Sequence, residues 1–279
     1  MKRFYENKNF RLKISQDFNA ESPREWDNLG KMVCWHRRYN LGDKHDYPDL
    51  ETFWESLAAE VGLEVKVDWD EEQIKEINSK VIILPLYLYD HGGITMNTGG
   101  FNYPWDSGQV GWIYCTKEKF RKETGYMEDE LFNPDPHRNP KQGEHVRIKG
   151  HENKDWGKIL SIDSQQSGIQ VVVDFDYNKI PSARKLDNIV TVPLTDIVEV
   201  MANRAQEMLI DEVKTYNQYL TSDVYSFTFS SKRRCGECGH VHFHTIDSAS
   251  GFYGRESLLD EIKDYLGNEY AEVLESVGV

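Results

Sequence analysis

Long hydrophobic runs are missing from this sequence. No stretch of its 279 residues approaches the roughly 18 consecutive apolar residues of a membrane span. The first residues, MKRFYENKNF, also lack the apolar core of a signal peptide. We therefore expect a protein that has no membrane contact and works in the cytoplasm.

Cysteine is scarce, since the chain contains only Cys34, Cys115, Cys235 and Cys238. This number is too small for a disulfide scaffold, and in a reducing compartment a close pair indicates metal binding or redox activity. The motifs of common enzyme classes are missing too: there is no nucleophile elbow, phosphate-binding loop, metalloprotease helix or paired-carboxylate signature. These absences favour a non-enzymatic protein.

Positive charge is in deficit, with 33 Lys and Arg against 47 Asp and Glu and a formal net charge of −14. Such a balance disfavours contact with a phosphate backbone unless a local basic face exists, and it favours basic partners. Aromatic residues make up 12% of the chain, which predicts a folded protein. Residues 140–200 are nearly neutral, with 8 basic against 9 acidic residues, and this difference indicates a separate unit.

A proline-rich segment, residues 132–144, marks a boundary in the chain, because its prolines exclude a helix interior or a central strand. We expect an α+β fold in which a discontinuous main domain of mixed sheet and helices comprises residues 1–139 plus 201–279. A small five-stranded β-barrel is expected as an insert at residues 140–200, since polar loops tolerate insertions. Three successive domains are the alternative, but the last of them would have a thin core.

Local patterns predict several elements of the main domain. A helical pattern begins after Asp49 and ends at Gly62, and a second occupies residues 116–125 between a Thr and a Gly. Residues 81–89, VIILPLYLY, have the pattern of a buried strand in which Pro85 predicts a bulge or an unpaired edge. Further expected elements are strands at 32–36 and 109–115 and helices at 70–78 and 203–220.

Residues 140–200 have the pattern of short strands, in which glycines separate alternating aliphatic residues. The segment GEHVRIKGHENKDWGKILSIDSQQSGIQVVVDF resembles the KOW and Tudor-like class of small five-stranded barrels, and TVPLTDIVEV is similar to their closing strand. Because members of that class often contact RNA, ribosomes or transcription machinery, the resemblance implies that the barrel contacts nucleic acid. A spacer barrel without a ligand is the alternative, since a fold does not define a function.

Five segments of the main domain together resemble an uncharacterised family of proteins carried by bacteriophages and conjugative elements of bacteria. They are Ser22–Asp43, Leu84–Met96, Trp105–Glu123, Tyr216–Phe227 and Gly251–Gly254. The resemblance implies an accessory role toward a bacterial host, in the host cytoplasm, and brings no established activity. Residues 140–200 and the CGECG segment look like additions to the family pattern.

The stretch RRCGECGHVHFHTID predicts a β-hairpin whose tip is CGECG. Cys-x-x-Cys-Gly is typical of a zinc knuckle, in which glycines let two thiolates converge on one ion. The candidate zinc ligands are Cys235, Cys238 and one of His240 and His242, with a fourth from Cys34, His36 or a second chain. An exposed polar hairpin tip with reduced thiols is the alternative.

A Cys–His or His–Asp catalytic arrangement is a further possibility. Cys34, His36 and His45 lie close together in the sequence, and Asp90–His91 follows the expected buried strand. However, MVCWH alternates as a strand, and a buried structural cysteine is the commoner outcome for such a position.

Residues 91–111 form a long glycine-rich segment between two expected strands. Because no helix follows it, it matches neither a phosphate-binding loop nor a dinucleotide fingerprint. We interpret it as an interaction loop that displays Tyr103, Trp105 and Asp106. A packed Ω-loop whose aromatic residues fill its own core is the alternative.

Acidic side chains cluster in DWDEEQ, which contains Asp68, Asp70, Glu71 and Glu72, and in YMEDELFNPD. Carboxylates at such positions are common at helix starts, where the helix dipole favours them. The sharper hypothesis is a nucleic-acid mimic, whose carboxylates occupy a basic groove on another protein.

From these observations we expect a non-enzymatic accessory protein of phage or mobile-element origin that acts on a host protein or nucleoprotein complex. Counter-defence through the acidic surface is one form of this hypothesis. The first alternative is direct RNA or DNA binding by the barrel and the hairpin, where Lys232, Arg233 and Arg234 are the candidate contacts. The second alternative is a Cys/His-dependent enzyme.

Overall fold

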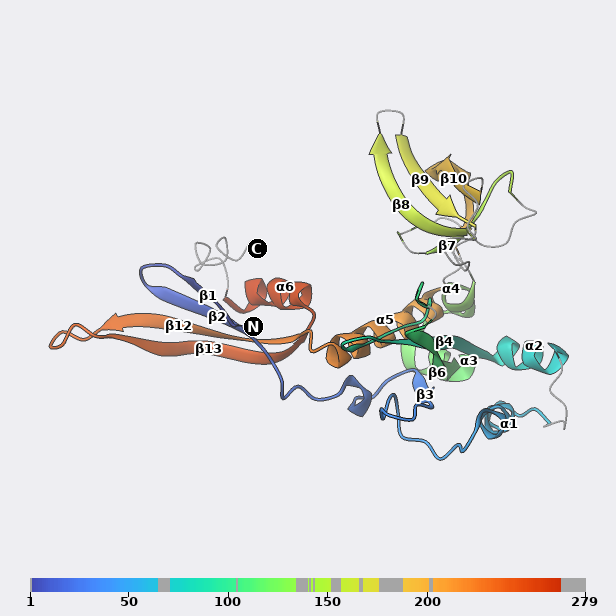
Figure 1. The fold of residues 1–279 in the computed structure, drawn as a ribbon, viewed down its shortest axis with the longest axis horizontal. Coiled ribbons are helices and arrows are strands. Elements are labelled where there is room, and N and C mark those ends of the chain that lie inside the picture. Colours follow the sequence, from blue (N-terminus) through green and yellow to red (C-terminus); the bar gives the residue numbers. More distant parts are fainter. Residues whose placement is uncertain are drawn as a thin grey trace. The chain divides into compact units, whose positions relative to one another are not determined.

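The computed structural model describes residues 2–64, 71–103, 105–133, 140, 142, 144–151, 157–165, 168–175, 188–200 and 203–266. The chain forms two compact units, the first made of Met1–Asp27, Asp90–Asn97 and Glu212–Val279, and the second of Asn28–Tyr89 and Thr98–Asp211. Helices occur together with mixed sheets, which confirms the predicted α+β class (Figure 1). The division into a domain of residues 1–139 plus 201–279 and an insert of residues 140–200 stays a prediction.

The first unit is built on a four-stranded antiparallel sheet. Its strands, in the order β1-β2-β12-β13, are β1 (Lys2–Glu6), β2 (Phe10–Gln16), β12 (Val224–Arg234) and β13 (Val241–Tyr253). Helix α6 (Arg255–Leu266) lies against this sheet (Figure 1). The core between them consists of Leu12, Ile14, Phe227, Phe229, Phe252, Leu258 and Ile262.

The predicted hairpin is confirmed as β12 and β13, and it is longer than expected. β13 continues to Tyr253 through a serine-rich stretch, because every position of β12 from Val224 to Arg234 has a partner on β13. The sheet is completed by β1 and β2, which the sequence analysis did not predict. The pairing of β2 with β12 ends at Ser231, so the hairpin tip extends past β2 (Figure 1).

The second unit contains β3 (Lys31–Cys34), β6 (Ser107–Thr116) and β4 (Val81–Asp90), with β6 paired antiparallel to both neighbours. The β4–β6 register shifts between Leu86 and Tyr87, where β6 contains the extra residue Val110, whereas Pro85 itself is paired with Trp112. The helices of this unit are α1 (Leu50–Glu60), α2 (Glu71–Lys80), α3 (Lys117–Thr124) and α4 (Glu128–Phe132). An aromatic core joins Phe53 and Tyr114 with the partly buried Trp35, Trp54 and Trp112.

The expected helix ends are confirmed. The Asp49 side chain accepts a hydrogen bond from the backbone N–H of Thr52 at 2.9 Å, and the Thr116 hydroxyl accepts one from Lys119 N–H at 3.2 Å. Gly125 ends α3 with a φ of 68°, a conformation that favours glycine. Helix α5 (Arg204–Leu220) also has its expected place, and its residues are divided between the two units.

Segment 91–111 is not the continuous loop that the sequence suggested. It contains β5 (Ile94–Asn97), and β6 already begins at Ser107. β5 belongs to the first unit, where the backbone N–H of Met96 donates to the Asn217 side-chain oxygen at 2.8 Å.

Five strands occur in the region that resembles a small barrel. They are β7 (His145–Ile148), β8 (Gly157–Gln165), β9 (Gly168–Asp174), β10 (Ile189–Pro193) and β11 (Ile197–Val200), in the order β10-β9-β8-β7-β11. The curled sheet buries aliphatic side chains from four of its strands, among them Val146, Ile159, Val171 and Val200. In the described part of this region, no ladder pairs β10 with β11, so its closure into a barrel stays a prediction.

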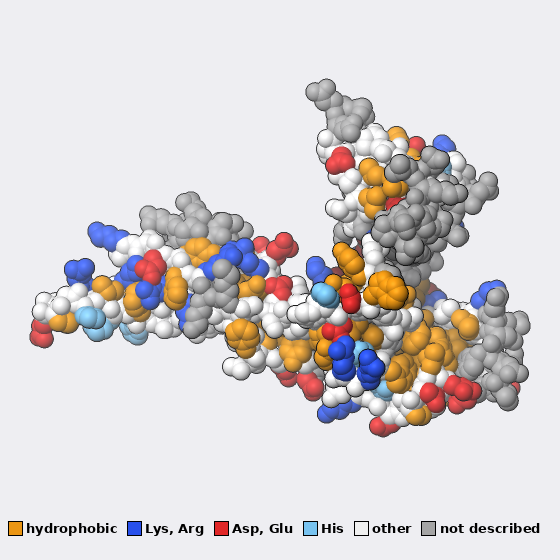
Figure 2. All heavy atoms as spheres, in the orientation of Figure 1, with side chains coloured by type: hydrophobic (Ala, Val, Ile, Leu, Met, Phe, Trp, Pro, Cys, Tyr) orange, Lys and Arg blue, Asp and Glu red, His pale blue; other side chains and the backbone are white. Residues whose placement is uncertain are grey.

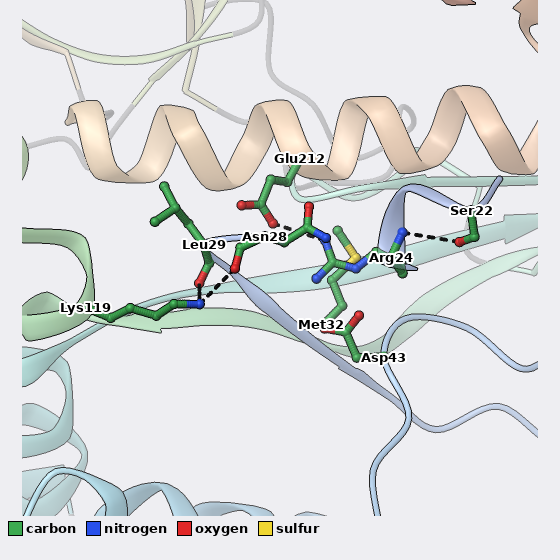
Figure 3. Close-up of polar contacts among 8 residues, drawn as sticks. All are labelled: Ser22, Arg24, Asn28, Leu29, Met32, Asp43, Lys119 and Glu212. Atoms are coloured by element: carbon green, nitrogen blue, oxygen red, sulfur yellow. Dashed lines mark hydrogen bonds and ion pairs between the residues drawn. The ribbon is translucent and has the colours of Figure 1, made fainter. Parts of the chain in front are cut away.

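Two cationic side chains, Arg24 and the partly buried Lys119, anchor irregular segments (Figure 3). In the first unit, the Arg24 guanidinium pairs with the Glu212 carboxylate at 3.0 Å, and the Arg24 side chain is only 4% exposed. In the second unit, the Lys119 ammonium donates to the backbone oxygens of Asn28 and Leu29 at 2.8 and 3.0 Å. Because each cation is bonded to groups on another segment, each one holds an irregular stretch of chain in place.

We expect Gly111→Ala to lower the free energy of unfolding by about 1–3 kcal/mol or more. A Cβ atom at Gly111 would lie 1.9 Å from the backbone oxygen of Val33, so β3 and β6 would have to separate. Gly108→Ala is the matched control in the same strand, since nothing lies within 4 Å of its added Cβ. Urea denaturation of both variants measures the difference, and equal stabilities would contradict the close approach at Gly111.

Candidate functional site on the open face of the first sheet

Helix α6 packs on one face of the sheet in the first unit, and the opposite face carries polar side chains that are mostly exposed or partly exposed in the described structure. Phe227 and Phe229 pack into the core with α6, and side chains alternate along a strand, so Thr228, Ser230 and Lys232 point to the opposite side. We call this side, opposite α6, the open face. Residues paired directly across two strands point to the same face of the sheet. The pairing therefore shows which side chains of β1, β2 and β13 lie on the open face.

A group of four side chains, one from each strand, crosses the open face. These are Glu6 of β1, Arg11 of β2, Lys232 of β12 and Phe243 of β13, and we call them the four-strand cluster. Glu6 forms ion pairs with both cations, at 2.7 Å in the case of Lys232. The guanidinium carbon of Arg11 lies 3.3 Å from the centroid of the Phe243 ring, which is a cation–π contact.

The four strands are basic although the whole chain is acidic. They carry seven Lys or Arg against two Asp or Glu, whereas the chain has a net charge of −14. Of the two acidic residues, Asp247 is paired with Phe229 and therefore shares the face of the core. Figure 2 shows Lys and Arg side chains on the surface of this sheet. The open face is thus the local basic surface that the overall composition does not reveal.

The cations around Glu6 change its ionisation. The hydrogen bond from Lys232, with a further one from Arg11, lowers the pKa of the Glu6 carboxyl below its usual value of 4.5. Glu6 is therefore ionised at neutral pH, and one carboxylate compensates two cations. A positive charge remains in the cluster, next to Lys13 and Arg234 on the same face.

Aromatic and hydroxyl side chains complete the open face. Phe4 is 53% exposed and Phe243 is 40% exposed, although both are large apolar residues. Arg11 lies between them, since its guanidinium carbon is also 5.3 Å from the Phe4 ring centroid. Further positions on this face are Ser226, Thr228, Thr245, Ser248 and Ser250. The surface therefore offers cations, flat rings and hydrogen-bonding hydroxyls together.

The predicted basic residues of the hairpin separate onto two faces. Lys232 belongs to the four-strand cluster, and Arg234 lies on the same face. Arg233 lies on the other face, paired with His242, and both are exposed. The sequence analysis missed Glu6, Arg11 and Phe243, although the alternation of Arg11 and Lys13 with Leu12 and Ile14 in FRLKISQ is the pattern of a strand with one polar face.

The hairpin tip brings its two cysteines together. Backbone N–H groups of Cys238 and Glu237 donate to the Cys235 sulfur and, with the neighbouring Cys238 thiol, lower the pKa of the Cys235 thiol. The His240 and His242 ring centroids are 6.1 Å apart, and both side chains are exposed. Among the described residues, no group of three or more His, Cys, Asp or Glu side chains is arranged to hold a metal ion. Zinc at this tip stays a prediction.

The loop residues Tyr103 and Trp105 are 61% and 96% exposed. Tyr103 is nevertheless held in place, because its ring packs against Tyr89 at 5.5 Å and its backbone oxygen accepts hydrogen bonds from Asp106 N–H and the Ser107 hydroxyl at 3.3 and 2.6 Å. An ordered loop thus displays a solvated Trp105, and the role of Tyr103, Trp105 and Asp106 in binding stays a prediction.

The acidic segment is described only in part. Asp68 and Asp70 lie outside the described residues, whereas Glu71 and Glu72 begin α2. A helix start is the ordinary place for carboxylates. The mimicry of nucleic acid by this segment therefore stays a prediction.

The two histidines near β3 that the sequence offers as catalytic candidates contact backbone groups in the described structure. Nε2 of His45 lies 2.9 Å from the backbone oxygen of Cys34, and Nδ1 of His45 has no hydrogen-bond partner in the described part of the chain. Nδ1 of His36 accepts hydrogen bonds from the backbone N–H groups of Arg38 and Tyr39 at 3.3 and 3.2 Å. Cys34 itself is 8% exposed and lies in the core. Such contacts are typical of structural residues, and a Cys/His-dependent enzyme stays a prediction.

Comparisons with protein-family models, with curated proteins and with solved structures gave no match. No helix within the described ranges is long and apolar enough to cross a membrane.

We expect the Glu6 carboxyl to titrate below the usual value of 4.5, and Lys232→Met to raise its pKa, because the hydrogen bond from Lys232 is the main cause of the shift. The pKa of Glu6 is lower in the folded state than in the unfolded state. The ionised carboxylate therefore stabilises the sheet at pH values above the unfolded-state pKa. This contribution is lost as the pH falls through the folded pKa. NMR titration of the side-chain carboxyl carbon measures both variants.

Lys8→Met is the control for this titration. It also removes one positive charge from the β1–β2 hairpin, but Lys8 is not among the groups that shift the Glu6 pKa. An equal effect of the two substitutions would contradict a specific Lys232–Glu6 contact.

Proposed function

We propose that this protein binds single-stranded nucleic acid on the open face of its first sheet. The observation that carries the proposal is the four-strand cluster, which places two cations and an exposed ring on one surface of an acidic chain. The sequence suggested direct RNA or DNA binding by the barrel together with the hairpin, and the present proposal keeps the hairpin and adds β1 and β2.

The charge distribution supports a phosphate-binding surface. Each Lys or Arg that contacts a phosphate releases condensed counterions, which is the main source of affinity for nucleic acid. Lys13, Arg11, Lys232 and Arg234 share the open face, and Glu6 is the one acidic strand residue beside them. The acidic remainder of the chain repels phosphates, so binding is expected to be confined to this face.

The exposed rings support a single strand over a duplex. The faces of duplex bases are hidden by stacking, whereas unpaired bases can stack on aromatic rings and guanidinium planes. Phe4 and Phe243 are exposed on the open face, and Arg11 lies over the Phe243 ring. The hydroxyls of Thr228 and Ser248 add donors and acceptors for sugar and base edges.

Arg11→Gln is expected to weaken binding of a fluorescent single-stranded oligonucleotide about 5- to 10-fold at moderate salt. It is also expected to reduce the slope of log affinity against log salt by about 0.7, since one phosphate contact is lost. Phe4→Ser is expected to weaken binding without changing that slope, because stacking releases no counterions. Fluorescence anisotropy over a series of salt concentrations measures both quantities.

Lys122→Gln is the control, because it removes one exposed positive charge from α3 of the second unit. If Arg11→Gln and Lys122→Gln had equal effects, binding would be a property of total charge. If the unaltered protein bound no single-stranded RNA or DNA, the proposal would be wrong.

A second candidate function is binding of a protein partner through Trp105, which is favoured by its 96% exposure on an ordered loop. Tryptophan is enriched among residues that dominate binding energies at protein interfaces. By the resemblance to phage and conjugative-element proteins, the expected partner is a bacterial host protein or nucleoprotein complex.

We expect Trp105→Ala to remove that partner from pull-downs performed with nuclease-treated host lysate. Phe18→Ala is the control, since Phe18 is a solvated aromatic residue at 76% exposure in the first unit. Recovery of the same partner by both variants would exclude Trp105 as the contact. Loss of the partner on nuclease treatment alone would show that nucleic acid bridges the two proteins.

A further inference from the structure

The tip of the β12–β13 hairpin is a folded turn that presents two thiols. Cys235 N–H donates to the His240 oxygen at 2.8 Å, and Gly239 N–H donates to the Cys235 oxygen at 3.0 Å, which closes the turn. Gly239 has a φ of +69°, a conformation that favours glycine. Cys235 and Cys238 both lie in this closed turn, where Cys235 is partly exposed and Cys238 is exposed.

This arrangement is half of a tetrahedral zinc site. Zinc binds thiolates at about 2.3 Å and takes four ligands in structural sites. Cys235 and Cys238 stand three positions apart in one turn that backbone hydrogen bonds close, so the turn holds two potential thiolate ligands near each other.

The described residues of the same chain do not supply the other half. No third Cys, His, Asp or Glu joins the two thiols in a metal-binding group within the described ranges. Cys34 and Cys115 are buried in the second unit, at 8% and 2% exposure. His240 and His242 lie next to the tip but are exposed and do not converge on the thiols.

The thiols of the turn are accessible in the described structure. The pairing of β2 with β12 ends at Ser231, so β12 continues past the edge of β2 before the tip begins (Figure 1). Cys238 is exposed and Cys235 is partly exposed. Arg233 and Arg234 directly precede the turn, and four thiolates with one Zn²⁺ carry a net charge of −2 that these cations would offset.

We infer that two copies of this protein join at their hairpin tips through one Zn²⁺ ion held by Cys235 and Cys238 of each copy. Binding displaces the thiol protons, so four Cys–S–Zn bonds form and up to four protons go to solvent. This inference is independent of the proposed nucleic-acid binding, because none of the four ligands belongs to the four-strand cluster.

The test is to purify the full-length protein in a buffer that contains zinc and a reductant free of metal ions. The zinc content and the molar mass of the protein are then measured. We expect about one zinc per two chains by elemental analysis and a dimer by light scattering, as four-ligand coordination requires. A chelator should convert the dimer to a monomer, and reductant alone should not. Cys235→Ser and Cys238→Ser should each lose both the metal and the dimer. Their fold should persist, since the tip lies outside the core, and circular dichroism checks this.

Three results would overturn the inference. A metal-free protein, or a dimer that reductant dissociates, would indicate free thiols or a disulfide. One zinc per chain in a monomer would indicate a site completed within the chain. Loss of zinc in the double variant His240→Ala/His242→Ala, with the thiols intact, would make histidine a ligand. That variant is therefore the matched control, and it should retain both the metal and the dimer.

Discussion

The burial of Phe227 and Phe229 against α6 is the constraint on which the first unit depends. Side chains alternate along a strand, so this burial also decides which residues of β12 remain in contact with solvent. Lys232 lies on the side opposite α6 as a consequence, and the antiparallel register brings Arg11 and Phe243 to it. A shift of one residue would exchange the two faces and remove the basic surface.

Glu6 has a double role on the open face. Two cations at close range repel each other, and the carboxylate between them allows both to remain partly buried on one sheet. Arg11 at the same time stacks on Phe243, which fixes its guanidinium plane. The cluster is thus held in one arrangement before any ligand binds, and such preorganisation reduces the entropy lost on binding.

The two proposals for this hairpin are compatible. The open face lies along its strands, and the thiols lie at its tip, so a zinc-linked pair would present two open faces in one complex. Two linked sites on one strand of nucleic acid gain affinity through their effective concentration, without any new contact. Dimerisation would therefore raise the affinity for long strands more than that for short ones.

Local patterns in the sequence were sufficient to predict the α+β class, the helices that follow Asp49 and Thr116, the buried strand at residues 81–89 and the β12–β13 hairpin. Each depends on residues that are near neighbours in the chain, through capping, a continuous apolar run or period-two alternation. The two cysteines of the hairpin tip are also near neighbours in the chain, so the sequence predicted their common turn together with the hairpin.

Only the tertiary structure decided the basic surface. Glu6 and Lys232 are separated by most of the chain, and they meet because β2 pairs with β12 in one register. Such pairing depends on long-range burial, which leaves no local signal in the sequence. The sequence by itself determined that the protein is acidic, aromatic-rich and α+β. The tertiary structure decided where its few cations gather, because that depends on which sheet face α6 covers.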